Sequence, residues 1–385
     1  VSTNHITGLL EHSIAIENLA VYAKIITDTY VKRGVKRMCI DIATVSELPG
    51  RDASEIMETM EARRDSFQQI LDRTRENDNA MTNVRREILK QDFKKPISTG
   101  YDRLDDIVWG FVKGNYYILS ARPSIGKTAF SLNVVVRILK NIDGLNILYF
   151  TLEQSEKDII RRMVAMLTSV NAKKLKRGQL NEMEQQEALI GLDTIHQWGL
   201  SNRLRIVEPV FSLSTSRIKS EIKRAQKVSP VDLVIIDQMS HIHEENEDKA
   251  ESTQVVTRNK SLKMKSIARE LDVPIVLLVQ QKRPTSGKNP PPSQTELKES
   301  GALEENADVI LLLWKPSIDS DDPNERNKVE LIVDKNRDDG ECGKIDLLWR
   351  GECLRFEDPN GVSLATPAQI LSLIHISEPT RPERI

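Results

Sequence analysis

The stretch Tyr116–Lys140, YYILSARPSIGKTAFSLNVVVRILK, decides how the rest of the chain folds. It opens with the β-forming run Tyr116–Leu119 and closes on a segment whose apolar residues recur at helical spacing. Between them lies ARPSIGKT, residues 121–128, a P-loop pattern with Ala121 where the general motif has its first glycine. A strand, a tight loop and a helix in this order predict a nucleotide-binding site.

The loop carries the groups that phosphate binding needs. Gly126 allows backbone N–H groups to approach phosphate oxygens, Lys127 neutralises phosphate charge, and the Thr128 hydroxyl is a ligand for Mg²⁺. The helix that follows adds unpaired N–H donors and the positive end of its dipole. We therefore predict that ATP and Mg²⁺ bind at Ala121, Arg122, Pro123, Ser124, Ile125, Gly126, Lys127, Thr128 and Ala129.

Composition bounds the class of protein. The length of 385 residues suits two or three domains, or one large α/β domain with appendages. With 55 basic against 57 acidic side chains the net charge is −2, so any nucleic-acid surface has to be local. There is no apolar run of about 18 residues, no signal-peptide pattern and no paired cysteine spacing. We expect reduced thiols, a cytoplasmic location and no membrane contact.

Periodicity divides the chain into four parts. Residues 1–80 have apolar positions at helical spacing and predict a helical N-terminal segment. Residues 81–96 predict a linker helix, and residues 97–358 alternate apolar strands with helices. The tail, residues 359–385, ends in LSLIHISEPTRPERI, which we interpret as a translated cloning adapter.

The alternation predicts an α/β fold with a mainly parallel, doubly wound sheet covered on both faces. Ligands of such sheets bind at the carboxyl ends of the strands, so the polar residues there are the candidates for chemistry. Besides the run Tyr116–Leu119, the expected strands are Leu145–Phe150, Leu204–Glu208, Val231–Ile236, Val273–Val279, Val309–Leu313, Val329–Val333 and Ile345–Trp349.

Three strand ends carry side chains suited to γ-phosphate hydrolysis. Asp237 follows four apolar residues, as in a Walker B strand, and can support Mg²⁺ together with Thr128. Glu153 can polarise the attacking water, and the alternative is an acid near the N-cap of the next helix. Gln280 can sense the γ-phosphate, and the alternative is an ordinary solvated strand end.

Lys335 and Arg337 end another strand and, being two residues apart, point the same way on extended chain. They are candidates for an arginine finger in a neighbour's site, and the alternative is surface charge. Upstream, residues 282–300 form a long loop rich in Pro, Ser and Lys. Lys298 and the backbone near Gly301 are candidates for contact with single-stranded nucleic acid.

The P-loop ARPSIGKTAF closely resembles that of the DnaB-type replicative helicases, which also have alanine at its first position. Further matches follow in the family's order over residues 97–356. They are TLE at 151–153, LVIID at 233–237, ARELDVP at 268–274, KESG at 298–301 and KNR at 335–337. The resemblance implies a RecA-like P-loop ATPase domain working as a homo-hexameric ring that encircles single-stranded DNA, moves 5′ to 3′ and unwinds duplex with ATP.

The resemblance also implies partners and site roles. Primase and a helicase loader are expected partners, residues 81–93 are expected to dock on the next subunit, and the globular front of the N-terminal region is expected to be missing. At the ATP site the implied groups are the phosphate and Mg²⁺ ligands Lys127, Thr128 and Asp237, the water-activating Glu153 and the sensor Gln280. The groups implied to act in trans are Lys335 and Arg337, and those implied in the DNA loop are Lys298, Glu299 and Gly301.

Some positions depart from the family pattern. Gln154 stands where the family has Met, Gln238-Met239 where it has Tyr-Leu, and Lys298 where it has Arg. These changes suggest a divergent member, encoded by a phage or prophage. Two other functions remain open: a RecA-like recombinase or clock-type ATPase, and a nucleotide-dependent loader or adaptor. KESG argues against the first, and Glu153 together with Arg337 argues against the second.

Overall fold

The computed structural model describes residues 95–209, 213–243, 253–281, 289–292, 300–338 and 340–359, and short pieces within residues 25–44. The chain divides into two units, Val1–Lys94 and Lys95–Ile385. The described residues of the first unit are all helical. The expected linker helix at 81–93 and the tail beyond residue 359 lie outside the described residues.

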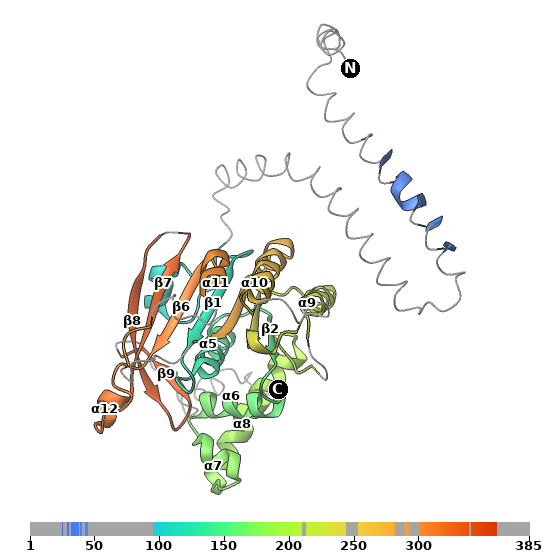
Figure 1. The fold of residues 1–385 in the computed structure, drawn as a ribbon. Coiled ribbons are helices and arrows are strands. Elements are labelled where there is room, and N and C mark those ends of the chain that lie inside the picture. The colour runs from blue at the N-terminus through green and yellow to red at the C-terminus, as the bar shows by residue number, and fades with distance from the viewer. Residues whose placement is uncertain are drawn as a thin grey trace, which may run out of the picture. The chain divides into compact units, whose positions relative to one another are not determined.

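Within the described residues, the second unit is built on a nine-stranded sheet with strand order β3-β2-β4-β5-β1-β6-β7-β8-β9 (Figure 1). Strands β3 to β6 of this order run parallel, whereas β7, β8 and β9 are added antiparallel. In chain order the strands are β1 (Tyr116–Ala121), β2 (Ile147–Thr151), β3 (Leu204–Val207), β4 (Leu233–Asp237), β5 (Ile275–Gln280), β6 (Val309–Trp314), β7 (Lys328–Asn336), β8 (Gly343–Arg350) and β9 (Arg355–Glu357).

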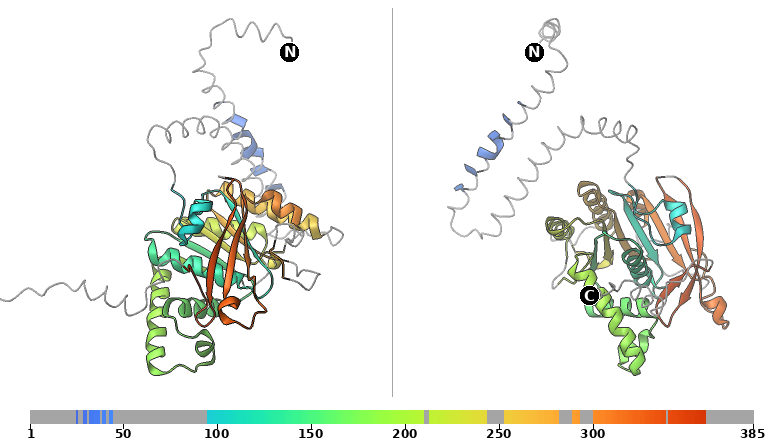
Figure 2. Two further views of the ribbon diagram at one scale, coloured as in Figure 1. Left: turned by 90° about the vertical axis from the view of Figure 1, so that its left-hand side faces the viewer. Right: turned by 180° about the vertical axis from the view of Figure 1, so that it is seen from behind.

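Helices cover the sheet on both faces (Figure 2). One buried cluster joins one face of the sheet to α4, α5, α6 and α8, and a second joins the other face to α9, α10 and α11. The helices are α4 (Asp102–Val108), α5 (Lys127–Asn141), α6 (Glu156–Thr168), α7 (Ala172–Arg177), α8 (Glu182–Leu200), α9 (Thr215–Val228), α10 (Thr253–Glu270), α11 (Ser300–Asn306), α12 (Pro323–Arg326) and the 3₁₀ turn η1 (Met239–His241).

Local sequence accounts for these elements. Strands β1, β2 and β4 are buried at every position, because each has a helical layer on both sides, and this explains their unbroken apolar sequences. Helix α6 begins after Ser155, whose side chain accepts from the Asp158 N–H. Helix α8 begins with a capping box between Asn181 and Glu184. The α/β fold with a mainly parallel sheet is confirmed.

The direction of the last strands could not be predicted from the sequence. Strand β7 is antiparallel to β6, and its last residue, Asn336, pairs with Val309, the first residue of β6. Lys335 and Arg337 therefore lie at the edge opposite the P-loop. Chain direction within a sheet depends on the connection: β6, β7 and β8 follow one another without the long helical crossover that a parallel pair needs. Strand β9, three residues long, is too short to show a pattern in the sequence.

Candidate nucleotide site

The P-loop leaves the middle of the sheet. Strand β1 pairs with β5 on one side and β6 on the other, so its C-terminal end lies at the centre of the edge where parallel strands end. Helix α5 begins at Lys127, directly after Gly126. Gly126 has φ 115°, and a Cβ built on it would lie 3.1 Å from Phe356 Cζ. The backbone angle favours glycine strongly here, and the Phe356 ring leaves little room for a Cβ.

Two opposite charges face each other at the start of α5. The Thr128 hydroxyl donates to Asp237 Oδ2, O···O 2.7 Å, which joins the P-loop helix to the end of β4. The Lys127 ammonium donates to Gln238 Oε1, next to Asp237 in the chain. Burial raises the pKa of Asp237 and lowers the pKa of Lys127, and each charge opposes the shift of the other. A bound phosphate would stabilise the buried Lys127 ammonium, and a bound metal would stabilise the buried Asp237 carboxylate.

Backbone contacts bring Glu153 to the same place. The Leu152 N–H donates to the Asp237 carbonyl, N···O 2.6 Å, and the Thr151 hydroxyl donates to the Gln154 carbonyl, O···O 2.5 Å. These bonds fold the segment after β2 over the end of β4. Gln280 stands opposite Ala121 in the register of β5 and β1, and the next N–H, of Gln281, donates to the Ala121 carbonyl.

A cavity of about 500 Å³ opens between these groups. Its lining includes both Glu153 and Gln280 together with most of the P-loop, so the structure gathers residues that the sequence spreads over about 160 positions. From the P-loop the lining takes Ala121, Arg122, Pro123, Ser124, Gly126, Lys127, Thr128 and Ala129. Ile125 alone of the predicted stretch does not line the cavity; it is buried in the core.

The residues present suit Mg²⁺. Asp237 is 1% exposed, and its Oδ1 has no hydrogen-bond partner among the described residues, while Oδ2 accepts from Thr128. A buried oxygen without a partner beside a phosphate-binding loop is the arrangement a hard cation completes. The described residues hold no cluster of three or more His, Cys, Asp or Glu side chains. Thr128, Asp237 and the phosphates themselves would therefore supply the ligands.

Several lining residues were missed in the sequence. Arg162 reaches the cavity from α6, Gln154 and Gln238 follow the predicted acids, and Trp349 and Leu354 come from β8 and the turn after it. None of these positions carries a local motif, and the antiparallel strands that bring Trp349 to this edge could not be placed from the pattern. Gln154 and Gln238 stand out only as departures from the family pattern.

Hydrogen bonds to the backbone of β9 and of the residue before it hold the P-loop helix α5 in place. The Asn133 amide, in the middle of α5, donates to the Leu354 carbonyl (2.8 Å) and accepts from the Phe356 N–H (3.1 Å). Arg137, one turn further on, donates to the Phe356 carbonyl at 3.0 Å. The buried Arg355 donates to the carbonyl of Met166 in α6 at 2.5 Å. Asn133, Arg137 and Arg355 are buried, and each makes hydrogen bonds there. The bonds of Asn133 and Arg137 fix how α5 lies against β9, and the bond of Arg355 joins β9 to α6.

Lys335 and Arg337 do not reach this cavity. The Lys335 ammonium donates to the Glu304 carbonyl, and the Arg337 guanidinium donates to the Glu305 carbonyl, N···O 2.6 Å. Both therefore lie against the C-terminal end of α11, at the opposite edge of the sheet. The Arg337 N–H donates to the carbonyl of Asp308, the residue just before β6. The Asp308 N–H in turn donates to the carbonyl of Tyr116, at the start of β1. The six-residue length of β1 therefore separates Arg337 from the P-loop.

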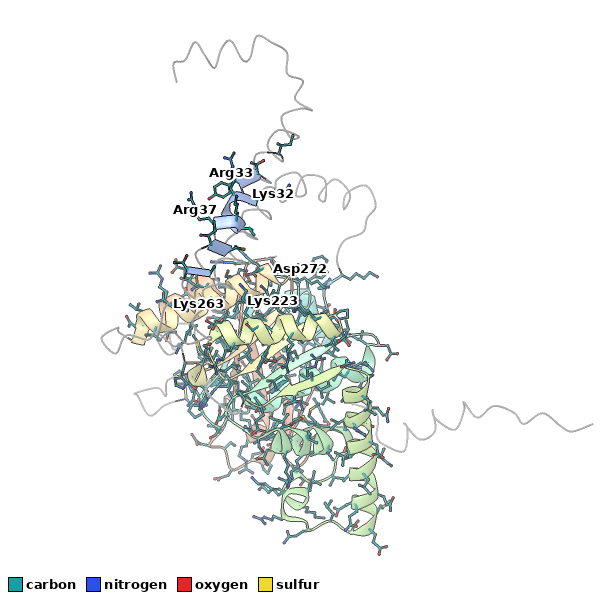
Figure 3. The ribbon with its side chains drawn as sticks, turned by 90° about the vertical axis from the view of Figure 1, so that its right-hand side faces the viewer. Lys32, Arg33, Arg37, Lys223, Lys263 and Asp272 are labelled. Atoms are coloured by element: carbon teal, nitrogen blue, oxygen red, sulfur yellow. The ribbon has the colours of Figure 1, made fainter. Side chains whose placement is uncertain are left out.

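The expected DNA loop is only partly described. Lys298 and Glu299 lie outside the described residues, and Gly301 is in the first turn of α11. Two basic runs of the sequence, residues 173–177 and 219–227, each contain lysines that pair with acids. In one, Lys219 and Lys223 of α9 both approach Glu270 of α10, at 2.8 and 3.2 Å. Figure 3 shows Lys223 on α9 with Lys263 on the neighbouring helix α10.

The second basic run, on α7, also reaches an acid. Lys174 lies 2.7 Å from Glu184, the capping acid of α8. Lys174, Lys219 and Lys223 therefore pair with acids of neighbouring helices. Among the described residues, no helix has the length and apolar character that spanning a membrane requires.

Comparison with known proteins identifies the relatives. Residues 96–358 match the family model "DnaB-like helicase C terminal domain". The replicative DNA helicase DnaC of Bacillus subtilis is 28% identical over 366 residues, which cover 92% of this chain and 78% of that protein. The replicative DNA helicase DnaB of Geobacillus stearothermophilus is 28% identical over 352 residues, 88% of this chain and 74% of that protein.

Solved structures agree. One that is described as an ATPase domain superposes with a TM-score of 0.63 at 27% identity and covers 73% of this chain and 98% of its own. A structure described as "The Structure Of A DnaB-Like Replicative Helicase And Its Interactions With Primase" has a TM-score of 0.69 over 92% of this chain and 82% of its own; at 24% identity it supports the fold alone. The chain belongs to the family of DnaB-like replicative helicases, which are ATP-dependent DNA-unwinding enzymes.

Proposed function

We propose that the chain is the motor of a homo-hexameric ring that moves 5′ to 3′ on single-stranded DNA and parts the duplex with ATP and Mg²⁺. The observation that carries this proposal is the division of the site between two edges of one sheet. The cavity is lined by the phosphate-binding loop, Glu153 and Gln280 and lies beside Asp237, whereas Lys335 and Arg337 lie at the far edge. A second copy that presents its far edge to this cavity would add Lys335 and Arg337 to the cations that line it, Arg122, Lys127 and Arg162.

Five residues of the nucleotide site have a chemical role in this proposal. Lys127 and the N–H groups at the start of α5 bind the β- and γ-phosphates. Thr128 and Asp237 would hold Mg²⁺, which would neutralise charge on the transferred phosphoryl group. Glu153 orients the attacking water and accepts its proton. Gln280 lies at the end of β5 beside Ala121, where its amide can hydrogen-bond the γ-phosphate.

Two groups of the next copy complete the reaction. Arg337 and Lys335 of a neighbour stabilise the negative charge on the γ-phosphate oxygens in the transition state. Hydrolysis then requires contact between subunits, whereas nucleotide binding does not. This difference separates a motor from a loader that binds nucleotide only to assemble.

The remaining proposals concern parts of the chain and partners. Residues 97–358 form the ATPase domain. Residues 81–96 form the linker helix, which docks on the next subunit, and residues 1–80 form a helical N-terminal segment. The last part of the tail, residues 359–385, is not native. Lys298, Glu299 and Gly301 contact DNA phosphates from the loop before α11. Primase and a helicase loader are partners, and the location is cytoplasmic. The chain is a phage or prophage member of the family.

Strand displacement on a forked DNA substrate tests the function. A motor that moves 5′ to 3′ unwinds a fork with a free 5′ tail in the presence of ATP and Mg²⁺ and leaves a fork with only a 3′ tail intact. A recombinase instead pairs strands, and a loader does neither. The control is the mass of the assembly with and without nucleotide, because an incomplete ring would fail to unwind for lack of assembly. A full ring that hydrolyses ATP without unwinding either fork contradicts the proposal.

A further inference from the structure

We propose that Tyr149 is a positioning residue for Asp237: its buried hydroxyl, held by Ser131, orients the carboxylate so that Oδ1 faces the Mg²⁺ position. This inference rests on the proposed function, because it concerns the same metal site. It assigns a role to a strand residue that no P-loop or Walker B pattern includes.

The geometry places the phenol against the carboxylate. Tyr149, on β2, stands opposite Ile235 of β4, two residues before Asp237, so its side chain is the diagonal neighbour of that carboxylate on one face of the sheet. The Tyr149 hydroxyl donates to Asp237 Oδ2 at 3.3 Å. It also lies 3.1 Å from Ser131 Oγ, one turn into α5. Tyr149, Ser131 and Asp237 are each at most 2% exposed.

Proton counting gives these contacts a direction. A carboxylate only accepts hydrogen bonds, and it is a stronger acceptor than a hydroxyl, so the single Tyr149 proton goes to Asp237. The single Ser131 proton has two acceptors within reach, the Thr128 carbonyl at 2.9 Å and the Tyr149 oxygen at 3.1 Å, so Ser131 holds the phenol through a proton that it shares with that carbonyl. A phenol is protonated at neutral pH, so it can serve as this donor.

The two carboxylate oxygens have different surroundings. Oδ2 accepts from two hydroxyls, those of Thr128 and Tyr149, whereas Oδ1 has no partner among the described residues. Two donors on one oxygen restrict rotation of the carboxylate about its Cβ–Cγ bond. With Mg²⁺ bound, the Thr128 hydroxyl would be a metal ligand, and Tyr149 would be the hydroxyl left to donate to Oδ2. Loss of its hydroxyl should weaken metal binding more than nucleotide binding.

The experiment uses the full chain and titrates MgCl₂ against binding of a fluorescent ATP analogue, with a parallel series in EDTA. For Tyr149→Phe we expect the Mg²⁺ concentration at half-maximal binding to rise about tenfold, or ~1.4 kcal/mol. Binding in EDTA should stay within about twofold of the original chain, because the P-loop N–H groups and Lys127 are unchanged. Tyr116→Phe is the matched control: Tyr116 is fully buried on β1 but packs in the core on the other face of the sheet.

The outcomes are distinguishable. An unchanged Mg²⁺ titration for Tyr149→Phe overturns the inference and leaves the proposed function intact. An equal loss with Mg²⁺ and in EDTA assigns Tyr149 to packing and also overturns it. If the original chain binds nucleotide without any Mg²⁺ dependence, the proposed function fails first. Should Tyr149→Phe not fold, Ser131→Ala decides: a rise of about twofold to threefold in the Mg²⁺ midpoint supports the inference, and no rise contradicts it.

Discussion

The two edges of the sheet differ in what they hold. At the edge where the parallel strands end, a cavity of about 500 Å³ is lined by Lys127 and Glu153 and lies beside the buried Asp237, whose Oδ1 has no hydrogen-bond partner within the described part of the chain. At the other edge, Lys335 and Arg337 donate to backbone carbonyls of α11 and lie outside that cavity. One edge has the groups suited to binding phosphate and metal, and the other holds Lys335 and Arg337. Within one chain the two sets cannot meet.

This separation has a mechanistic consequence. The strands are rigid and buried, so no rearrangement of a loop can carry the cations across the sheet to the P-loop of the same chain. Binding and hydrolysis should therefore depend on different edges: binding on the cavity alone, and hydrolysis on both. Four substitutions test this comparison.

The largest expected effect comes from the far edge. For Arg337→Ala we expect steady-state ATP hydrolysis to fall by about 10³–10⁵-fold, the usual worth of an arginine finger, with nucleotide affinity nearly unchanged. Arg224→Ala, at an exposed position on α9, is the matched control and should hydrolyse ATP at the original rate. A sharper version mixes Arg337→Ala with Lys127→Ala chains. Each is inactive alone, but mixed rings should regain hydrolysis where an intact cavity meets an intact arginine. Unaltered turnover by Arg337→Ala alone would show that one chain suffices.

The next effect belongs to the cavity. Glu153→Gln keeps the shape of the side chain and removes its ability to accept a proton, so hydrolysis should fall by about 10²–10⁴-fold while ATP still binds. Glu156→Gln, at the first position of α6, is the control for loss of an acid nearby. Single-turnover hydrolysis and nucleotide affinity measured on both variants check the prediction. If Glu153→Gln hydrolyses normally, the N-cap interpretation of this acid is the correct one.

Gly126→Ala should have a smaller effect, on both binding and stability. The new Cβ would meet Phe356 at 3.1 Å with φ at 115°, which costs about 1–3 kcal/mol in a sparsely populated backbone region. Gly178→Ala is the matched control, since Gly178 has φ 67° and no atom within 4 Å of the added Cβ. It should lose only the ~1–2 kcal/mol that the left-handed backbone conformation costs an L-residue. Urea unfolding and nucleotide affinity measure both; equal losses of affinity would exclude a role for the contact with Phe356.

The smallest effect concerns stability and pH. Burial raises the pKa of Asp237 above its ordinary value of 3.8, so the folded state disfavours its ionised form. The stability linked to this group is complete below that ordinary value and is lost as the pH rises through the folded pKa. Asp237→Asn removes this cost, and without nucleotide or Mg²⁺ its melting temperature at neutral pH should be about 2–4 °C higher, as ~1 kcal/mol would give. The gain should shrink as the pH is lowered toward the ordinary pKa of 3.8. A gain that is independent of pH would point to packing instead.

Much of the nucleotide site could be predicted from the sequence, because its parts are local. A tight turn between a buried strand and a helix needs Gly126, Lys127 and Thr128 consecutively, and an apolar strand that ends in Asp237 is recognisable from residues 233–237 alone. The fold class followed from the unbroken apolar strands. The direction of β7, the position of β9 and the residues of the cavity that come from β8 could not be predicted, since they depend on which strands pair.

By itself, the sequence determined the phosphate-binding loop, the acids at the strand ends and the family, because each depends on residues adjacent in the chain or on an ordered series of short motifs. The tertiary structure alone decided that Lys335 and Arg337 lie across the sheet from the cavity, and that Tyr149 contacts Asp237, 88 residues away. The physical reason is the same in both cases. A strand alternates its side chains between two faces whatever its neighbours are, so its sequence specifies neither its direction in the sheet nor the side chain opposite.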